Sequence, residues 1–163
     1  MKKLLTLALA LMMLFAMTAC ATGQEADGQP VLTVAMSPDF SPMEFVDTSK
    51  TGQDQYVGFD VTLANYIADE LGMTLEIQPM SFDACQTAVQ LGTVDMSISG
   101  FSWTAERAEN YAISDYYIAG DNETEQVIIT TADKAGTLTT AEAFSGLKVA
   151  AQAASLQELL CIE

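Results

Sequence analysis

Apolar residues follow two patterns that take turns along the chain. Short continuous apolar runs, rich in β-branched residues, predict buried strands at three places: 31–36, 73–78 and 94–99. Apolar residues spaced three and four apart predict a helix over 59–71, and a second helix is expected over 82–91, starting after Ser81. Mostly apolar strands that alternate with helices predict an α/β fold with a parallel sheet covered by helices on both faces.

Shorter patterns predict the remaining elements. Residues 44–47 and 55–58 flank a polar loop and predict a hairpin. A short helix is expected from Thr104, and a last helix is expected to begin at Ser155. Extended segments, the last of them a strand, are predicted at 112–119, 126–131 and 147–152.

The sheet topology predicts where a ligand would bind. In open parallel sheets, ligands bind outside the carboxyl ends of the strands, which here are the loops 37–41, 80–82 and 99–104. These loops and the start of the next helix hold the candidate ligand-binding residues Ser37, Phe40, Phe82, Gly100, Ser102 and Arg107. Arg107 is the only arginine of the chain, and a guanidinium group can grip a carboxylate through two hydrogen bonds. Hydroxyls, a glycine and aromatic rings around it suit a zwitterion that carries a side chain.

The first twenty residues have the pattern of a secretory leader. Lys2 and Lys3 precede an apolar run that ends in Met-Thr-Ala-Cys, and the run is short for a membrane-spanning helix. The ending resembles the lipobox of bacterial lipoproteins, which implies a cleaved signal peptide over 1–19 and lipidation of Cys20. An ordinary secretory peptide is the alternative. Residues 20–30 are small and polar, and they are expected to form a flexible tether.

Charge and composition exclude several kinds of function. The chain has 22 acidic residues against six Lys and Arg, and its net charge is −16. Removal of the leader would remove two of the six cations and bring the net charge to −18. Nucleic-acid binding is not expected, because phosphate contacts need clustered Lys and Arg. The chain contains no histidine, which excludes a histidine-dependent catalytic triad and a His-based zinc site.

The three cysteines do not form a disulfide framework. If Cys20 is lipidated, Cys85 and Cys161 remain. Cys85 lies in a helical pattern and is interpreted as a small core residue, with a Cys85–Cys161 bridge as the less favoured alternative.

Three ordered motifs carry a specific family resemblance. The chain resembles the extracellular solute-binding proteins of family 3, from about Val31 to about Leu160, in the stretches VAMSPDFSPMEF, YVGFDVTLANYIADELG and VDMSISGFSWTAERAENYAISDYY. The resemblance implies a two-lobe fold of the periplasmic-binding-protein type and the capture of a polar amino acid outside the membrane. It also implies delivery to the permease subunits of an ABC importer, with no cofactor, no metal and no catalytic residues. A lipid anchor would hold the protein on the outer face of the cytoplasmic membrane.

The family's binding residues fall on specific positions of this chain. The resemblance implies that Arg107 clamps the α-carboxylate of the ligand, while Gly100 and Ser102 meet its α-amino and carboxylate groups. Phe40 and Phe82 would sandwich the ligand. A turn at the start of the last helix would add donors, with Ser155 as the candidate and Gln152 beside it.

The chain departs from the family pattern at three points. Ser37 stands where the family often has an acidic residue, and Ala154 replaces a usual glycine. Family members also continue beyond the point where this chain stops. The expected organisation is a leader at 1–19, a tether at 20–30, an incomplete first lobe at 31–120, and a hinge with a truncated second lobe at 121–163.

Each candidate residue also has a plain structural interpretation. Arg107 could pair with Glu106 or Glu109, Phe40 and Phe82 could be core residues, and Ser102 and Ser155 could only begin helices. Glu44 and Asp60 are interpreted as structural or surface residues, and Trp103 as a residue that packs at its loop.

The same fold leaves other functions open. A sensory or partner-binding module is one alternative, and a fragment that binds no ligand is another. An enzyme of the same fold is a third, although no paired catalytic carboxylates stand out near the loops.

Overall fold

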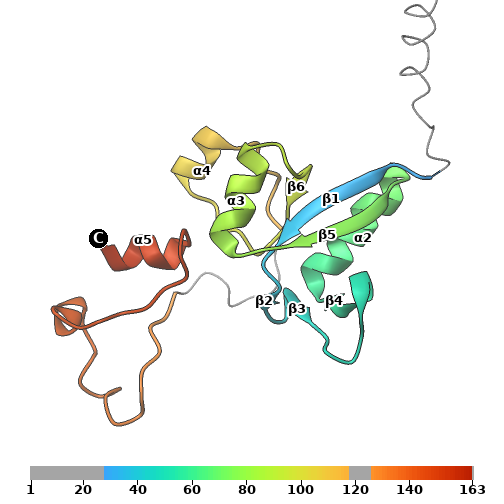
Figure 1. Cartoon of the computed structure of the whole chain (residues 1–163). Helices are drawn as coiled ribbons and strands as arrows, with labels where there is room; N and C mark the ends of the chain where they lie inside the picture. The colour runs from blue at the N-terminus through green and yellow to red at the C-terminus, as the bar shows by residue number, and fades with distance from the viewer. Residues whose placement is uncertain (1–27, 118–125, 163) are drawn as a thin grey trace, which may run out of the picture.

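The structure of the protein is a computed structural model that describes residues 28–117 and 126–162 (Figure 1). The expected leader at 1–19, the lipidation residue Cys20 and most of the expected tether lie outside the described residues. The acidic run 121–125 lies outside them as well.

A three-stranded parallel sheet forms the centre of the described fold. Its strands are β1 (Val31–Met36), β5 (Thr74–Pro79) and β6 (Met96–Ser97), in the order β5-β1-β6. β1 pairs with β5 over its full length, from Val31 opposite Thr74 to Met36 opposite Pro79. The parallel sheet predicted from the sequence is therefore confirmed.

The third strand is shorter than the predicted range 94–99. The Asp95 carboxylate accepts hydrogen bonds from the backbone N–H of Thr33 at 2.8 Å and from its hydroxyl at 2.6 Å. The same Thr33 hydroxyl accepts a hydrogen bond from the Asp95 N–H at 3.0 Å. Side-chain bonds thus replace part of the backbone ladder at the start of β6, a competition typical of Asp and Thr.

Two helices cover opposite faces of this sheet, as predicted (Figure 1). Helix α2 (Phe59–Leu71) packs on the face formed by Leu32, Val34 and Met36. Helix α3 (Phe82–Gln90) packs on the other face, where Cys85 lies against Ala35. The alternation of side chains along β1 explains this division, because successive residues of a strand point to opposite faces.

A small antiparallel sheet lies beside the start of α2. It consists of β2 (Asp39–Phe40), β3 (Glu44–Val46) and β4 (Tyr56–Val57), with the short 3₁₀ helix η1 (Gly52–Gln55) between the last two strands. The predicted hairpin of β3 and β4 is confirmed. It packs so closely on the first turn of α2 that a Cβ atom at Gly58 would lie 2.3 Å from the Met43 carbonyl oxygen.

The rest of the described chain contains little regular structure. Its elements are helix α4 (Ala105–Asn110), the 3₁₀ helix η2 (Ala141–Phe144) and helix α5 (Leu156–Ile162). The strand predicted at 147–152 is wrong, and the extended segments at 112–117 and 126–131 form no strand either. No described strand pairs with these segments, and apolar side chains such as Val127 and Ile129 remain exposed.

No helix within the described ranges has the length and apolar character needed to cross a membrane.

Candidate functional site

The loops at the carboxyl ends of β1, β5 and β6 open on one cleft. The cleft has a volume of about 860 Å³ and lies between these loops and the C-terminal segment. It is lined by seven of the eight ligand-binding residues predicted from the sequence: Ser37, Phe40, Phe82, Gly100, Ser102, Arg107 and Gln152. The eighth, Ser155, is buried beside the cleft and does not line it. The topological prediction of the site is therefore consistent with the geometry.

Arg107 holds the two sides of the cleft together. It lies in α4, where the Thr104 hydroxyl caps the helix by accepting a hydrogen bond from the Arg107 N–H at 3.1 Å. Its Nη1 donates to the Ser102 carbonyl and its Nη2 to the Ala154 carbonyl, both at 2.6 Å. Its Nε donates to the Gln86 side-chain oxygen at 3.3 Å. Three of the five guanidinium N–H groups are used in this way among the described residues.

The charge of Arg107 is buried without a carboxylate partner among the described residues. The side chain is only 9% exposed, and the one ion pair found within the described residues joins Lys50 to Asp47. Burial lowers the pKa of the guanidinium below its usual value, although not far enough to discharge an arginine. The interpretation that Arg107 merely pairs with Glu106 or Glu109 is therefore wrong. A buried cation without a counter-ion favours the binding of an anion.

Two aromatic rings support the guanidinium group. Its central carbon lies 5.6 Å from the ring centre of Phe82 and 5.5 Å from that of Phe101, distances that allow cation–π attraction. The two rings pack on each other with their centres 4.6 Å apart. Phe82 is buried, so it holds Arg107 in place as well as lining the cleft.

Ser37, Phe40 and Gly100 lie together on the side of the cleft formed by the loops after β1 and β6. The backbone N–H of Ser37 donates to the Ser99 hydroxyl at 3.0 Å, which ties the loop after β1 to the loop after β6. Gly100 has a φ of 55°, and a Cβ atom there would lie 2.9 Å from the Phe40 ring. The positive φ favours glycine at this position, and a Cβ atom would also force the Phe40 ring to shift. Phe40 is half exposed and presents its ring to the cleft.

The turn before α5 has a different role from the one expected. The Ser155 hydroxyl accepts a hydrogen bond from the Glu158 N–H at 3.1 Å and donates to the Gln152 carbonyl at 2.7 Å. Ser155 therefore begins the helix, as its plain structural interpretation holds, and its hydroxyl is occupied in this structure. Ala154 has a φ of 60°, in the left-handed region where the family's usual glycine would be unstrained.

Sequence reasoning missed several residues of this site. Gln86 and Phe101 contact Arg107, and the exposed Asp39 contributes a carboxylate to the cleft. Gln86 lies one helical turn after Phe82 on α3, and this spacing could have indicated that it lies near the cleft. Glu44 and Asp60 are fully buried next to the loops, which corrects the possibility that they are surface residues.

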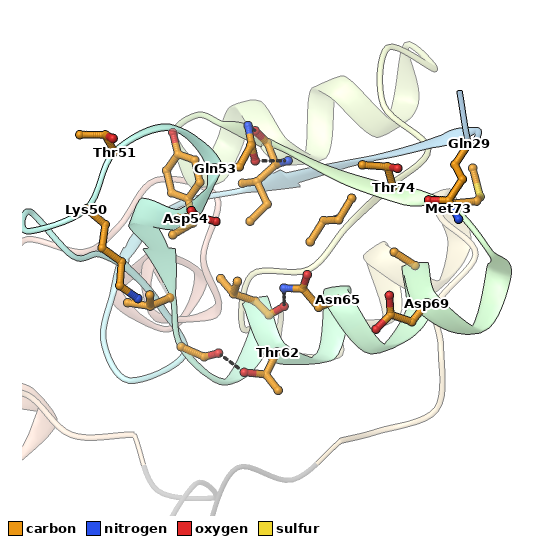
Figure 2. A pocket seen from close by; sticks show the side chains of 17 residues that line it. Gln29, Lys50, Thr51, Gln53, Asp54, Thr62, Asn65, Asp69, Met73 and Thr74 are labelled. Carbon is orange, nitrogen blue, oxygen red and sulfur yellow. Dashed lines mark hydrogen bonds between the residues drawn. The ribbon is translucent and has the colours of Figure 1, made fainter. Parts of the chain in front are cut away.

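A second hollow lies beside α2, away from these loops (Figure 2). It has a volume of about 900 Å³, and several of its polar side chains bond to nearby backbone, such as Gln53 to Ile77. Its lining cation, Lys50, pairs with Asp47. This hollow contains none of the predicted ligand-binding residues, so the cleft at Arg107 is the candidate site although it is no larger.

The described residues contain no group of three His, Cys, Asp or Glu side chains that could hold a metal ion. Cys85 and Cys161 are free thiols, so no bridge joins them. Burial raises the pKa of the Cys85 thiol to about 11, which agrees with its interpretation as a core residue.

This α/β unit, with a buried arginine beside its strand-end loops, agrees with the family resemblance found in the sequence. The family described as bacterial extracellular solute-binding proteins, family 3, matches residues 32–156. The chain belongs to this family, and its fold is that of the periplasmic binding proteins.

Similar proteins are named for the binding of arginine. The chain is 36% identical over 124 residues to the arginine-binding extracellular protein ArtP of Bacillus subtilis (strain 168), a match that covers 75% of this chain and 47% of that protein. It is also similar to the crystal structure of the arginine-bound form of domain 1 from TmArgBP, the T. maritima ArgBP. That match has 38% identity and a TM-score of 0.52, and it covers 59% of this chain and 73% of the other.

The chain spans about half the length of the curated relative ArtP. A more distant relative is an enzyme, the cyclohexadienyl dehydratase of Pseudomonas aeruginosa, with 31% identity over 88 residues, 54% of this chain and 31% of that protein. The family itself is one of solute-binding proteins rather than enzymes.

Proposed function

We propose that this protein is the substrate-binding component of an amino-acid ABC importer, and that it captures arginine or a similar cationic amino acid. The observation that carries the proposal is the buried charge of Arg107, which has no carboxylate partner among the described residues. Two of its N–H groups are not used by the described hydrogen bonds, one on each Nη. They suit the α-carboxylate of an amino acid, which a guanidinium group binds through two parallel hydrogen bonds.

The cleft also offers a counter-charge for a cationic side chain. The exposed Asp39 carboxylate lines the cleft, where it accepts a hydrogen bond from the Ser37 hydroxyl at 3.1 Å. The net charge of −16 attracts cations to the protein as a whole. Relatives named as arginine-binding proteins support the same choice of ligand.

The remaining predicted residues have compatible positions. Phe40 and Phe82 line the cleft beside Gly100, and Ser102 lies within the same loop. Gln152 and the turn at Ser155 would complete the site from the C-terminal side. Ser155 would act through its backbone, because its hydroxyl caps α5.

We further propose that Cys20 carries a lipid anchor and that the protein presents its ligand to permease subunits at the outer face of the cytoplasmic membrane. The supporting observations are the Met-Thr-Ala-Cys ending of the leader pattern and membership of an extracellular family.

A first lobe can be enough for binding. The T. maritima domain 1 structure is an arginine-bound form, and this chain covers 73% of it. That relative supports binding by the residues described here over the alternative of a non-binding fragment.

The ligand is tested by titrating the purified protein with L-arginine, L-lysine, L-glutamine and L-glutamate. Trp103, the single tryptophan of the chain, lies in the loop of Gly100 and Ser102 and serves as a fluorescence reporter. We expect the tightest binding for arginine and the weakest for glutamate. Asp39→Asn should weaken arginine binding by about tenfold or more, because a hydrogen bond to a charged group contributes roughly 1.5–3 kcal/mol.

Asp54→Asn, an exposed carboxylate at the second hollow, is the matched control and should leave arginine affinity unchanged. Equal loss in both variants would attribute the effect to overall charge. No binding of any amino acid would contradict the proposed function.

A further inference from the structure

Two buried carboxyl groups lie at the floor of the cleft, where Glu44 is one of the lining residues. Glu44 lies in β3 and Asp60 in the first turn of α2, and they are 1% and 0% exposed. The close packing at Gly58 brings them together, because the Asp60 N–H donates to the Met43 carbonyl at 2.8 Å. Both carboxyl groups bond to the same stretch of the loop after β6, because Ser99 donates its hydroxyl to Glu44 and the neighbouring Gly100 donates its N–H to Asp60.

Each carboxyl group uses one oxygen to hold a loop of the cleft. One oxygen of Glu44 accepts a hydrogen bond from the Ser99 hydroxyl, and that hydroxyl in turn accepts the N–H of Ser37 at 3.0 Å. One oxygen of Asp60 accepts the N–H of Gly100 at 2.8 Å and the Tyr117 hydroxyl at 3.1 Å. Ser37 and Gly100 are thus positioned by the two carboxyl groups.

The second oxygen of each group has no donor. Glu44 Oε2 and Asp60 Oδ1 are buried, and no N–H or O–H of the described residues reaches either of them. Two ionised carboxylates in such a place would repel each other and leave two buried acceptors unsatisfied. A single proton between them would remove both costs at once.

We propose that Glu44 and Asp60 share one proton, with Glu44 Oε2–H donating to the Asp60 carboxylate, and that this pair positions Ser37 and Gly100 for ligand binding. Glu44 is assigned the proton because its other oxygen accepts one hydroxyl, whereas Asp60 accepts two donors that favour its ionised form. The role in binding rests on the proposed function, whereas the shared proton does not.

The groups that face the pair support this assignment. Burial raises the pKa of the Glu44 carboxyl to about 8, and the charge of Asp60 acts in the same direction, with a smaller effect from Asp39. Tyr117 faces the pair from the segment after α4, and burial together with the Asp60 charge raises the pKa of its hydroxyl. The Cys85 thiol of α3 is also near Glu44. None of the described lysines or Arg107 forms an ion pair with either carboxyl group.

The pair predicts a stability that falls as the pH rises. An unfolded Glu has its ordinary pKa of 4.5, so between pH 4.5 and about 8 the folded protein keeps a proton that the unfolded chain releases. Stability from this proton is complete below 4.5 and lost above 8. The unfolding temperature of the ligand-free protein should therefore fall across this window.

Amide variants separate the shared proton from its alternatives. In Glu44→Gln, the amide N–H₂ donates to Asp60 and cannot titrate, so the fall with pH should flatten. Asp60→Asn removes the neighbouring charge and offers an amide donor, so the fall with pH should flatten only in part, because burial still raises the pKa of Glu44. The double variant would place two N–H₂ groups face to face and should be less stable than the two single changes predict together. Glu70→Gln and Asp69→Asn, both exposed on α2, are the matched controls.

The experiment measures thermal unfolding from pH 5 to 9, the infrared band of a protonated carboxyl group at pH 7, and arginine binding at the two ends of the range. We expect the band in the wild-type protein and in the controls but not in Glu44→Gln, which has no carboxyl group at that position. The arginine affinity of both proteins is compared at low and at high pH. The affinity of the wild type should fall by roughly tenfold more than that of Glu44→Gln. The charge of arginine itself changes equally for both proteins, so it does not contribute to this difference.

An unchanged pH dependence in Glu44→Gln, or an infrared band that survives in it, would overturn the shared proton. An arginine affinity with the same pH dependence in both proteins would overturn the positioning role. If no amino acid binds at all, the proposed function fails, while the unfolding and infrared results still decide the fate of the pair.

Discussion

At the scale of single residues, the site contains buried charged groups that lack a partner of opposite charge among the described residues. Arg107 is a buried cation without an anion among the described residues, and Glu44 and Asp60 are buried acids without a cation. Buried charges of this kind destabilise a protein unless a ligand or a proton balances them. The binding of a small charged molecule near either feature would therefore change the stability of the protein.

Ala154 is a residue-scale departure that can be tested directly. Its φ of 60° is unfavourable for a residue with a Cβ atom. Ala154→Gly should therefore stabilise the protein by roughly 0.5–1 kcal/mol, measured by urea unfolding.

The neighbouring change Ala153→Gly is the matched control. Ala153 is exposed and has no positive φ, so its replacement should destabilise slightly through the entropy of the unfolded chain. Equal effects at the two positions would show that the left-handed conformation of Ala154 is not present in solution.

Local chemistry explains why some site residues could be predicted and others could not. The sequence allowed the prediction of Arg107, Phe40 and Gly100, because their residue types and their positions after strands indicate ligand contact. Glu44 and Asp60 are 16 residues apart, and no short-range pattern marks them as a pair. Gln86 of α3 and Phe101 of the loop before α4 contact Arg107 only through the tertiary fold.

At the scale of elements, the helices and strands with strong periodicity were predicted well. Helix α2 spans Phe59–Leu71 as predicted, since Gly72 ends it in the left-handed conformation. The strand at 147–152 was predicted from its apolar run, but strands also need a paired neighbour. The described residues offer none, so the segment remains irregular.

Two glycines that flank α2 provide a test at this scale. Gly58 has a φ of 128° and lies against the backbone of Met43, where a Cβ atom would come within 2.3 Å of the carbonyl oxygen. Gly58→Ala should cost roughly 3 kcal/mol or more in the free energy of unfolding and disturb the ligand site through Glu44 and Asp60.

Gly72→Ala serves as the control at the other end of the helix. Gly72 also has a positive φ, of 65°, but a Cβ atom there meets nothing within 4 Å. The expected cost is about 1 kcal/mol, with ligand binding intact. Similar costs at both glycines would mean that the contact between the Met43 loop and α2 does not organise the site.

At the scale of the whole molecule, the described chain has an α/β part of the solute-binding family and a C-terminal segment, and Arg107 joins the two by donating to the Ala154 carbonyl. The segment between 126 and 155 contains η2 and otherwise little regular structure, with several apolar side chains exposed. Residues 28–117 have the parallel sheet that the sequence pattern and the family predict. The second part follows the family pattern in sequence but forms no sheet here.

The attachment to the membrane is a whole-molecule prediction. Cys20→Ser should release the protein from membranes, because a net charge of −16 gives no attraction to anionic lipids in place of the acyl chains. Cell fractionation with a high-salt wash measures the distribution.

Cys161→Ser, which changes an exposed free thiol, is the control and should remain with the membranes. A Cys20→Ser protein recovered wholly in the membrane fraction would show that another feature anchors the chain.

The central claim is that Arg107 binds the α-carboxylate of an amino acid. The most direct measurement is a calorimetric titration with L-arginine and with agmatine, the same molecule without its carboxylate, into wild type, Arg107→Ala, Arg107→Lys and the control Lys50→Ala. Loss of this contact should cost roughly 2–5 kcal/mol, a weakening of at least tens of fold. We predict that wild type and Lys50→Ala strongly prefer arginine, that Arg107→Lys keeps part of the preference, and that Arg107→Ala binds both ligands equally weakly. A folded Arg107→Ala protein that still prefers arginine over agmatine as strongly as wild type does would contradict the account.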